Sequence, residues 1–137
     1  MRTLSLDTAR ALLAGDDDDR RRLEAAAARA MGWKPPATRE DDDYDEWTRD
    51  GFVSIGLPPY LSDRADLNDE MERALRELAQ CLTIQWNRGF PREWLWGIIL
   101  SPVAPGDGFE VQGPTKAKAL VLALAALGML KEDDHGE

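Results

Sequence analysis

Residues 81–100 read CLTIQWNRGFPREWLWGIIL, and this stretch decides the fold class. Two β-rich runs, residues 81–87 and 94–100, flank a segment that contains Gly and Pro, a pattern typical of a β-hairpin. A symmetric register places three pairs opposite each other: Trp86 and Trp94, Ile84 and Trp96, Leu82 and Ile98. Because side chains alternate along a strand, all six then share one apolar face, and the other face is mixed. The apolar face needs a helix to cover it.

Two segments on either side of the hairpin predict such helices. Residues 64–80 carry apolar side chains at helical spacing opposite a charged face, with Ser62 or Asp63 as the expected N-cap. Residues 115–130 follow Pro114, which favours the first helical turn, and are apolar on nearly all sides. A helix of that kind belongs in the interior. We therefore expect it to cover the tryptophan face of the hairpin.

Helices are also expected in the N-terminal part of the chain. Asp7 is the expected cap of a short helix that ends at Ala14. The acidic run at residues 16–19 precedes a second helix over residues 20–31. Acidic side chains in that place interact favourably with the positive end of the helix dipole, which is sufficient to explain the run.

The chain has 137 residues, the length of one domain. We predict a single α+β domain over residues 1–137, with a small, mainly antiparallel sheet of three or four strands and with three or four helices. A further short strand is expected at residues 109–112. Residues 33–59 form a long connection that contains one short strand within residues 51–57. Residues 131–137 are a polar tail that we expect to be flexible.

Charge and composition narrow the classes of partner and ligand that fit this chain. Acidic residues outnumber basic ones 26 to 17, a net charge of −9, which disfavours nucleic acids and anionic membranes as partners. A protein with a basic surface is the natural partner. Cys81 is the only cysteine and the only histidine, His135, is in the tail, so we expect no metal, no cofactor and a reducing, cytoplasmic location. The apolar run at residues 119–130 is too short to span a membrane.

Three segments resemble motifs of the phage ABA-sandwich domain family, which comprises small phage and prophage proteins of largely unassigned function. They are LPPYLSD at residues 57–63, GPTKAKALVLA at residues 113–123 and ARAMGW at residues 28–33. Leu61 stands where the family has Ser, and Lys118 stands where it usually has an apolar residue. The resemblance implies a three-layer α/β/α sandwich and a phage or prophage origin. It supplies no catalytic residues.

The most unusual stretch is EDDDYDEW at residues 40–47. It is open to four interpretations: a calcium or magnesium site, a pair of catalytic carboxylates, a recognition surface, or a solvated loop with Trp47 packed in the core. The stretch lacks the glycine turn and the distal glutamate of an EF-hand, and no nucleophile accompanies the carboxylates. As a recognition surface, the acids steer a basic partner and the aromatic side chains anchor it. The candidate partner-binding residues are Asp41, Asp42, Asp43, Tyr44, Asp45 and Glu46.

Other groups have simpler interpretations. The acids of residues 63–72 compensate a helix dipole, or they join the first cluster in one negative face that imitates DNA phosphates. A hydrophobic core explains Trp86, Trp94 and Trp96 better than a stacking platform for bases or sugars does. Cys81 is expected to be a small buried hydrophobe.

Together these observations predict a non-enzymatic phage or prophage accessory protein in the cytoplasm of a bacterial host. It would bind a host protein through an acidic surface, for example to inhibit a defence system. Two alternatives stay open. One is a small-molecule-binding protein that holds a nucleotide-like signal near Arg88 and Arg92, although the side chains of this pair are expected to lie in solvent. The other is a component of virion assembly.

Overall fold

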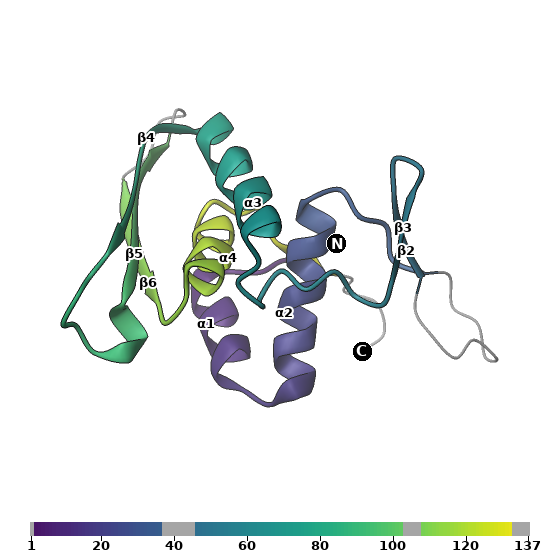
Figure 1. The fold of residues 1–137 in the computed structure, drawn as a ribbon, viewed down its shortest axis with the longest axis horizontal. Helices are drawn as coiled ribbons and strands as arrows, with labels where there is room; N and C mark the ends of the chain where they lie inside the picture. The colour runs from purple at the N-terminus through teal and green to yellow at the C-terminus, as the bar shows by residue number, and fades with distance from the viewer. Residues whose placement is uncertain (1, 37–45, 103–107, 133–137) are drawn as a thin grey trace.

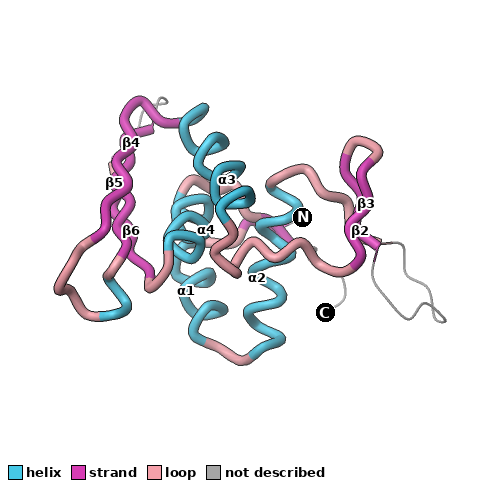
Figure 2. Tube along the Cα trace, in the orientation of Figure 1, coloured by secondary structure: helices cyan, strands magenta, loops and turns pink. Residues whose placement is uncertain are grey.

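The computed structural model describes residues 2–36, 46–102 and 108–132 and confirms the α+β class. Over these ranges the chain forms four α-helices and three small antiparallel sheets (Figures 1 and 2). The helices are α1 (Leu6–Ala14), α2 (Asp17–Ala30), α3 (Ala65–Leu78) and α4 (Lys116–Ala126).

The largest sheet contains the predicted hairpin and one further strand. Its order is β4 (Ala79–Trp86), β5 (Trp96–Pro102) and β6 (Phe109–Gly113), all antiparallel. The predicted register is wrong by two residues: the observed pairs are Trp86 with Trp96, Ile84 with Ile98, and Leu82 with Leu100. A shift by an even number of residues leaves every side chain on its expected face, so the apolar face is retained. Trp94 instead ends a short 3₁₀ helix, η1 (Arg92–Trp94), in the connecting loop.

Helix α4 is the centre of the core. It packs against β5 and β6, and also against α1 and α3 (Figure 1). Ile98, Leu100 and Val111 of the sheet are fully buried, as is most of α4. The expectation that this apolar helix lies inside is therefore confirmed. Thr115 caps it, so Pro114 precedes the cap instead of occupying the first turn.

The second face of this sheet is not covered by any helix in the described residues (Figure 1). The exposed residues on it are Cys81, Thr83, Ile99, Ser101 and Glu110. The three-layer α/β/α arrangement is therefore not confirmed. The expectation that Cys81 is buried is wrong, because its side chain lies on this open face.

Assigning all three hairpin tryptophans to the core is also wrong. Trp86 is 59% exposed and Trp94 is 52% exposed, whereas Trp96 is half-buried and packs against the core. Trp86 and Trp94 are exposed because they lie beyond the part of the sheet that α4 contacts. Helix α4 packs on β5 and β6, whereas Trp86 lies at the end of the edge strand β4 and Trp94 lies in the loop.

The acidic run near the N-terminus is the start of a helix, as expected. Asp16 is the N-cap of α2, and its Oδ1 accepts a hydrogen bond from the amide of Asp19 at 2.9 Å. The helix begins earlier than predicted because the acids themselves form its first turn. At α1 the predicted cap is wrong, since Ser5 and not Asp7 caps the helix.

The predicted caps of α3 are wrong as well. Its N-cap is Arg64, which makes no side-chain capping bond. Asp63 has another role: its Oδ1 accepts hydrogen bonds from Asn68 Nδ2 at 2.9 Å and from the amide of Ala117 at 3.1 Å. One carboxylate thus ties the start of α3 to the start of α4.

The ends of the described chain pair with each other. Strand β1 (Arg2–Thr3) is antiparallel to β7 (Lys131–Glu132). The Glu132 carboxylate binds Arg2 at 2.7 Å and Arg22 at 2.6 Å. The prediction of a flexible tail over residues 131–137 is therefore wrong for its first two residues, which form a strand, and residues 133–137 lie outside the described residues.

A second hairpin, missed as such in the sequence, projects on the side of the helices away from the three-stranded sheet (Figure 1). It consists of β2 (Glu46–Arg49) and β3 (Phe52–Ile55). Asp50 and Gly51 connect the strands with φ angles of 48° and 87°, which is the left-handed pair that a two-residue hairpin turn requires. This hairpin forms one side of the candidate site.

Candidate functional site

The acidic stretch that the sequence singled out leads into this hairpin. The predicted residues Asp41, Asp42, Asp43, Tyr44 and Asp45 lie outside the described residues. Glu46 is the first residue of β2 and is exposed. Trp47 follows it and is buried, as the loop interpretation expected for this side chain.

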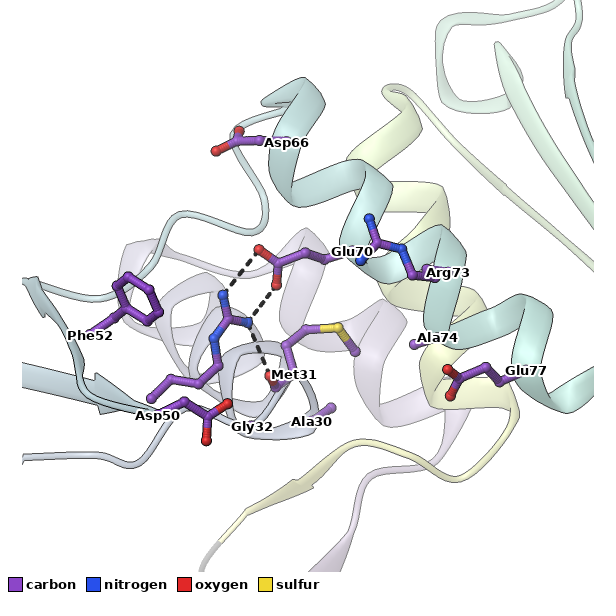
Figure 3. A pocket seen from close by; sticks show the side chains of 11 residues that line it. Ala30, Met31, Gly32, Asp50, Phe52, Asp66, Glu70, Arg73, Ala74 and Glu77 are labelled. Carbon is purple, nitrogen blue, oxygen red and sulfur yellow. Dashed lines mark hydrogen bonds and ion pairs between the residues drawn. The ribbon is translucent and has the colours of Figure 1, made fainter.

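A groove of about 760 Å³ lies beside the hairpin (Figure 3). The end of α2, the hairpin and the outer side of α3 form its walls. Four carboxylates line it, from Asp50, Asp66, Glu70 and Glu77, against two guanidinium groups. The groove is therefore net negative, and an anionic ligand is disfavoured there.

Arg49 and Glu70, which both line this groove, form a two-point ion pair, drawn as dashed lines to Glu70 in Figure 3. Arg49 Nη1 donates to Glu70 Oε1 at 2.6 Å, and Nη2 donates to Oε2 at 3.2 Å. Nη1 also donates to the carbonyl of Met31 at 3.1 Å. The guanidinium lies 4.5 Å from the centre of the Trp33 ring, within the range of a cation–π contact. A single side chain thus holds β2 to α3 and to the end of α2.

Tyr60 completes the cluster from the loop before α3. Its side chain is fully buried, and its hydroxyl donates to Glu70 Oε1 at 2.8 Å. The same hydroxyl accepts a hydrogen bond from Trp33 Nε1 at 2.9 Å. Two aromatic polar groups of the interior are thereby satisfied.

The electrostatics follow from these contacts. Burial, together with the hydrogen bond to Glu70, raises the pKa of Tyr60, so the phenol keeps its proton and donates it. Burial acts to raise the pKa of Glu70, but hydrogen bonds from Arg49 and Tyr60 outweigh it and hold this pKa below its usual value. The hydrogen bond with Glu70 raises the pKa of Arg49. The cluster is thus a closed network of charges and hydrogen bonds.

Strand β3 of the hairpin carries exposed apolar side chains on both of its faces. Phe52 is 70% exposed, Val53 is 55% exposed and Ile55 is 65% exposed, although all three belong to β3. The register places Val53 and Ile55 on the face away from the groove, and Phe52 lines the groove. The outer edge of β3 pairs with no residue in the described part of the chain.

Among the described residues, no group of three or more His, Cys, Asp or Glu side chains is placed to hold a metal ion. None of the described helices has the length and apolar character needed to cross a bilayer. Arg88 and Arg92, the pair considered for a nucleotide-like signal, are both exposed, as expected.

The sequence contains one signal for this site. Asp50-Gly51 between two β-rich segments is the strongest short-range sign of a hairpin, and it predicts the pairing of β2 with β3. The Arg49–Glu70–Tyr60 cluster had no such sign, since its members are 10 to 21 residues apart along the chain.

Comparisons of this chain with models of protein families, with curated proteins and with solved structures find no match.

Proposed function

We propose that this chain is a non-enzymatic phage or prophage accessory protein that binds a host protein with a basic surface, using the β2–β3 hairpin. One observation carries the proposal: Phe52, Val53 and Ile55 are exposed on a strand whose outer edge is unpaired within the described residues. Proteins normally protect such an edge with charges, prolines or a covering element. An apolar edge that lacks this protection is typical of an interaction site.

The charge around the hairpin supports a basic partner. Glu46 and Asp50 lie at the two ends of β2, and Asp66 and Glu77 line the adjoining groove. The whole chain carries a net charge of −9. Acids that surround an apolar centre accelerate encounter with a basic surface and select against acidic ones, while the apolar centre supplies most of the affinity.

The Arg49–Glu70–Tyr60 cluster supports binding over catalysis. Its charged and polar groups are engaged with one another, and it fixes the hairpin on the helices. A rigid support of this kind lowers the entropy that binding must overcome. The phage or prophage origin, the bacterial cytoplasm and a role such as defence inhibition rest on the resemblance of residues 57–63 and 113–123 and belong to the same proposal.

The test compares two isoleucines that are both exposed on strands. Ile55→Ser removes an apolar contact from the hairpin, and Ile99→Ser makes the same change on the open face of the other sheet. Purified wild-type protein and both variants are used to capture partners from bacterial lysate, and the captured protein is then purified and titrated. We expect Ile55→Ser to weaken binding about tenfold and Ile99→Ser to leave it unchanged.

Two parts of the proposal remain, a host protein as the partner and a basic contact surface. The identity of the captured protein tests the first, and the salt dependence of binding tests the second. Binding to a basic surface weakens as salt screens the charges. Equal binding by wild type and Ile55→Ser, or a partner with an acidic contact surface, contradicts the proposal. Capture of a virion protein in place of a host protein would favour the assembly role.

A further inference from the structure

The open face of the three-stranded sheet carries a second cleft, far from the proposed protein-binding hairpin in Figure 1. It has a volume of about 410 Å³, within the range of about 300–1,000 Å³ that is usual for small-molecule sites. Its lining residues are Gln85, Asn87, Phe90, Trp94, Glu110 and Gln112. Three side-chain amides, one carboxylate and two aromatic rings thus surround one space.

Two of the lining glutamines flank a glycine of the middle strand. The register pairs Gly97 with Gln85 of β4 on one side and with Gln112 of β6 on the other. A Cβ atom at position 97 would lie 3.2 Å from Asn87 Nδ2 and 3.5 Å from Gln85 Cγ. The missing side chain lets these two amides lean over the middle strand. This explains why Gly97 is buried on a face that is otherwise open.

The amides of this row are available to a ligand. Gln85 and Gln112 are half-buried, and neither side chain makes a hydrogen bond to any other residue in the described part of the chain. Each amide group presents two donors and an acceptor. Glu110 adds an exposed acceptor from the neighbouring row.

The aromatic wall is held in place by its own loop. Asn87 Nδ2 donates to the carbonyl of Trp94 at 3.0 Å, and the amide of Asn87 donates to the carbonyl of Leu95 at 2.6 Å. The amide of Phe90 donates to the carbonyl of Asn87 at 3.1 Å. Phe90 and Trp94 are nevertheless each about half exposed. Exposed aromatic side chains at the edge of a polar cleft can stack on a ligand.

We propose that this cleft binds a neutral saccharide. Hydroxyl groups donate and accept hydrogen bonds, as the amides do, and the C–H face of a sugar ring is attracted to the negative face of an aromatic ring. A phosphate-bearing ligand does not fit, because among the described residues the only charged group lining the cleft is the Glu110 carboxylate, and the chain has a net charge of −9. The inference is independent of the proposed protein-binding function.

The test uses saturation-transfer NMR on the whole chain with defined probes. These are neutral oligosaccharides of glucose, galactose, mannose and N-acetylglucosamine, with adenosine and uridine as probes for base stacking. We expect saturable transfer to the ring protons of at least one oligosaccharide. Trp94→Ala should weaken its binding about tenfold, since a ring contact contributes up to about 1.5 kcal/mol. Gln85→Ala should weaken it as well.

Trp86→Ala is the matched control. Trp86 is as exposed as Trp94, but the register places it on the opposite face of the same sheet. Circular dichroism establishes that each variant is folded. Saccharide binding that Trp94→Ala weakens and Trp86→Ala leaves intact supports the proposal. The proposal is overturned by absence of transfer to every oligosaccharide at high millimolar concentration, by binding of the nucleosides alone, or by equal effects of the two tryptophan variants.

Discussion

Arg49 on β2 and Glu70 on α3 are joined by two parallel hydrogen bonds of 2.6 and 3.2 Å, although 21 residues separate them in the sequence. About a quarter of each side chain is exposed. Water therefore screens the attraction between the two charges only in part. Arg49 also binds the Met31 carbonyl at the end of α2. This one guanidinium group therefore ties the exposed hairpin to both helices.

We predict that Arg49→Ala lowers the free energy of unfolding by about 1–3 kcal/mol, because it leaves the Glu70 carboxylate partly buried without its strongest partner. The matched control is Arg76→Ala, which breaks the pair of the more exposed Arg76 with Glu72 on the same helix, where Lys116 still binds Glu72 at 3.3 Å. That change should lower stability by less than about 1 kcal/mol. Urea denaturation measures both. Equal losses in the two variants contradict a special role for the Arg49–Glu70 pair.

The same pair predicts a specific dependence on pH. Arg49 and Tyr60 hold the pKa of Glu70 below its usual value of 4.5, despite the opposing effect of burial. A carboxylate with a depressed pKa stabilises the fold above its unfolded-state pKa, and this contribution is lost as the pH falls through the folded-state pKa. The stability advantage of wild type over Glu70→Gln should be constant from about pH 7 to about pH 5 and shrink below that. An advantage that persists at the lowest pH where the protein is folded argues against the linkage.

The three-stranded sheet shows which parts of the fold the sequence could predict. Alternation in residues 81–100 assigned the two faces correctly, because the face of a side chain depends only on the parity of its position. The register failed because it assumed that the apolar Trp94 belongs to a strand. The residue instead ends a 3₁₀ turn, which moves the first pair to Trp86 and Trp96.

The candidate site was predicted only in part, for a different reason. The predicted acidic stretch leads into the candidate site, because Glu46 begins the exposed hairpin. The contacts that hold this hairpin join Arg49 and Tyr60 to Glu70, and Trp33 to Tyr60. These residues come from four separate segments, and no local periodicity relates them. Their proximity follows from tertiary packing, which a single sequence does not display.

The pKa of Glu24 is shifted in the opposite direction to that of Glu70, so the predicted effect on stability has the opposite sign. Burial raises the pKa of Glu24, although its Oε2 accepts a hydrogen bond from the amide of Leu61 at 2.8 Å. A raised pKa means that the ionised form is disfavoured in the folded state, so the charge lowers stability at neutral pH. Glu24→Gln keeps an acceptor for Leu61 and removes the charge. Thermal unfolding at about pH 7 should show equal or higher stability of the variant.

Two further measurements make this test complete. The advantage of Glu24→Gln should decrease as the pH falls, because wild-type Glu24 then takes up a proton. Glu24→Ala, which removes the acceptor, should lower stability at every pH, since the Leu61 amide loses its partner. If Glu24→Gln is clearly less stable than wild type at neutral pH, the charge itself must be stabilising and the assignment is wrong.

The open sheet face can be checked through Cys81, the only thiol. Because its side chain is exposed, we predict that native protein reacts completely with Ellman's reagent without denaturant. The control is Val111→Cys in a Cys81→Ser background, which places a thiol on the face that α4 covers, at a fully buried position. This second thiol should react only through unfolding, and therefore much more slowly. Protection of Cys81 in the native protein would mean that this face is covered in solution.

Asp63 makes the last prediction, because it combines an unusual backbone angle with two hydrogen bonds. Its φ of 61° lies in the left-handed region, where Asn, Asp and Gly are the residues best tolerated. Its Oδ1 accepts from Asn68 Nδ2 and from the Ala117 amide, and Asn68 is buried. The side chain therefore supports both the turn and the junction of α3 with α4.

Three substitutions separate these contributions by urea denaturation. Asp63→Asn keeps the backbone preference and an acceptor, so it should lower the free energy of unfolding least. Asp63→Gly suits the φ angle but leaves two donors without a partner, a loss of about 1–3 kcal/mol. Asp63→Ala loses the acceptor and adds left-handed strain of about 1 kcal/mol or more, so it should be the least stable of the three. If Asp63→Gly proves as stable as Asp63→Asn, the junction of α3 and α4 does not depend on this carboxylate.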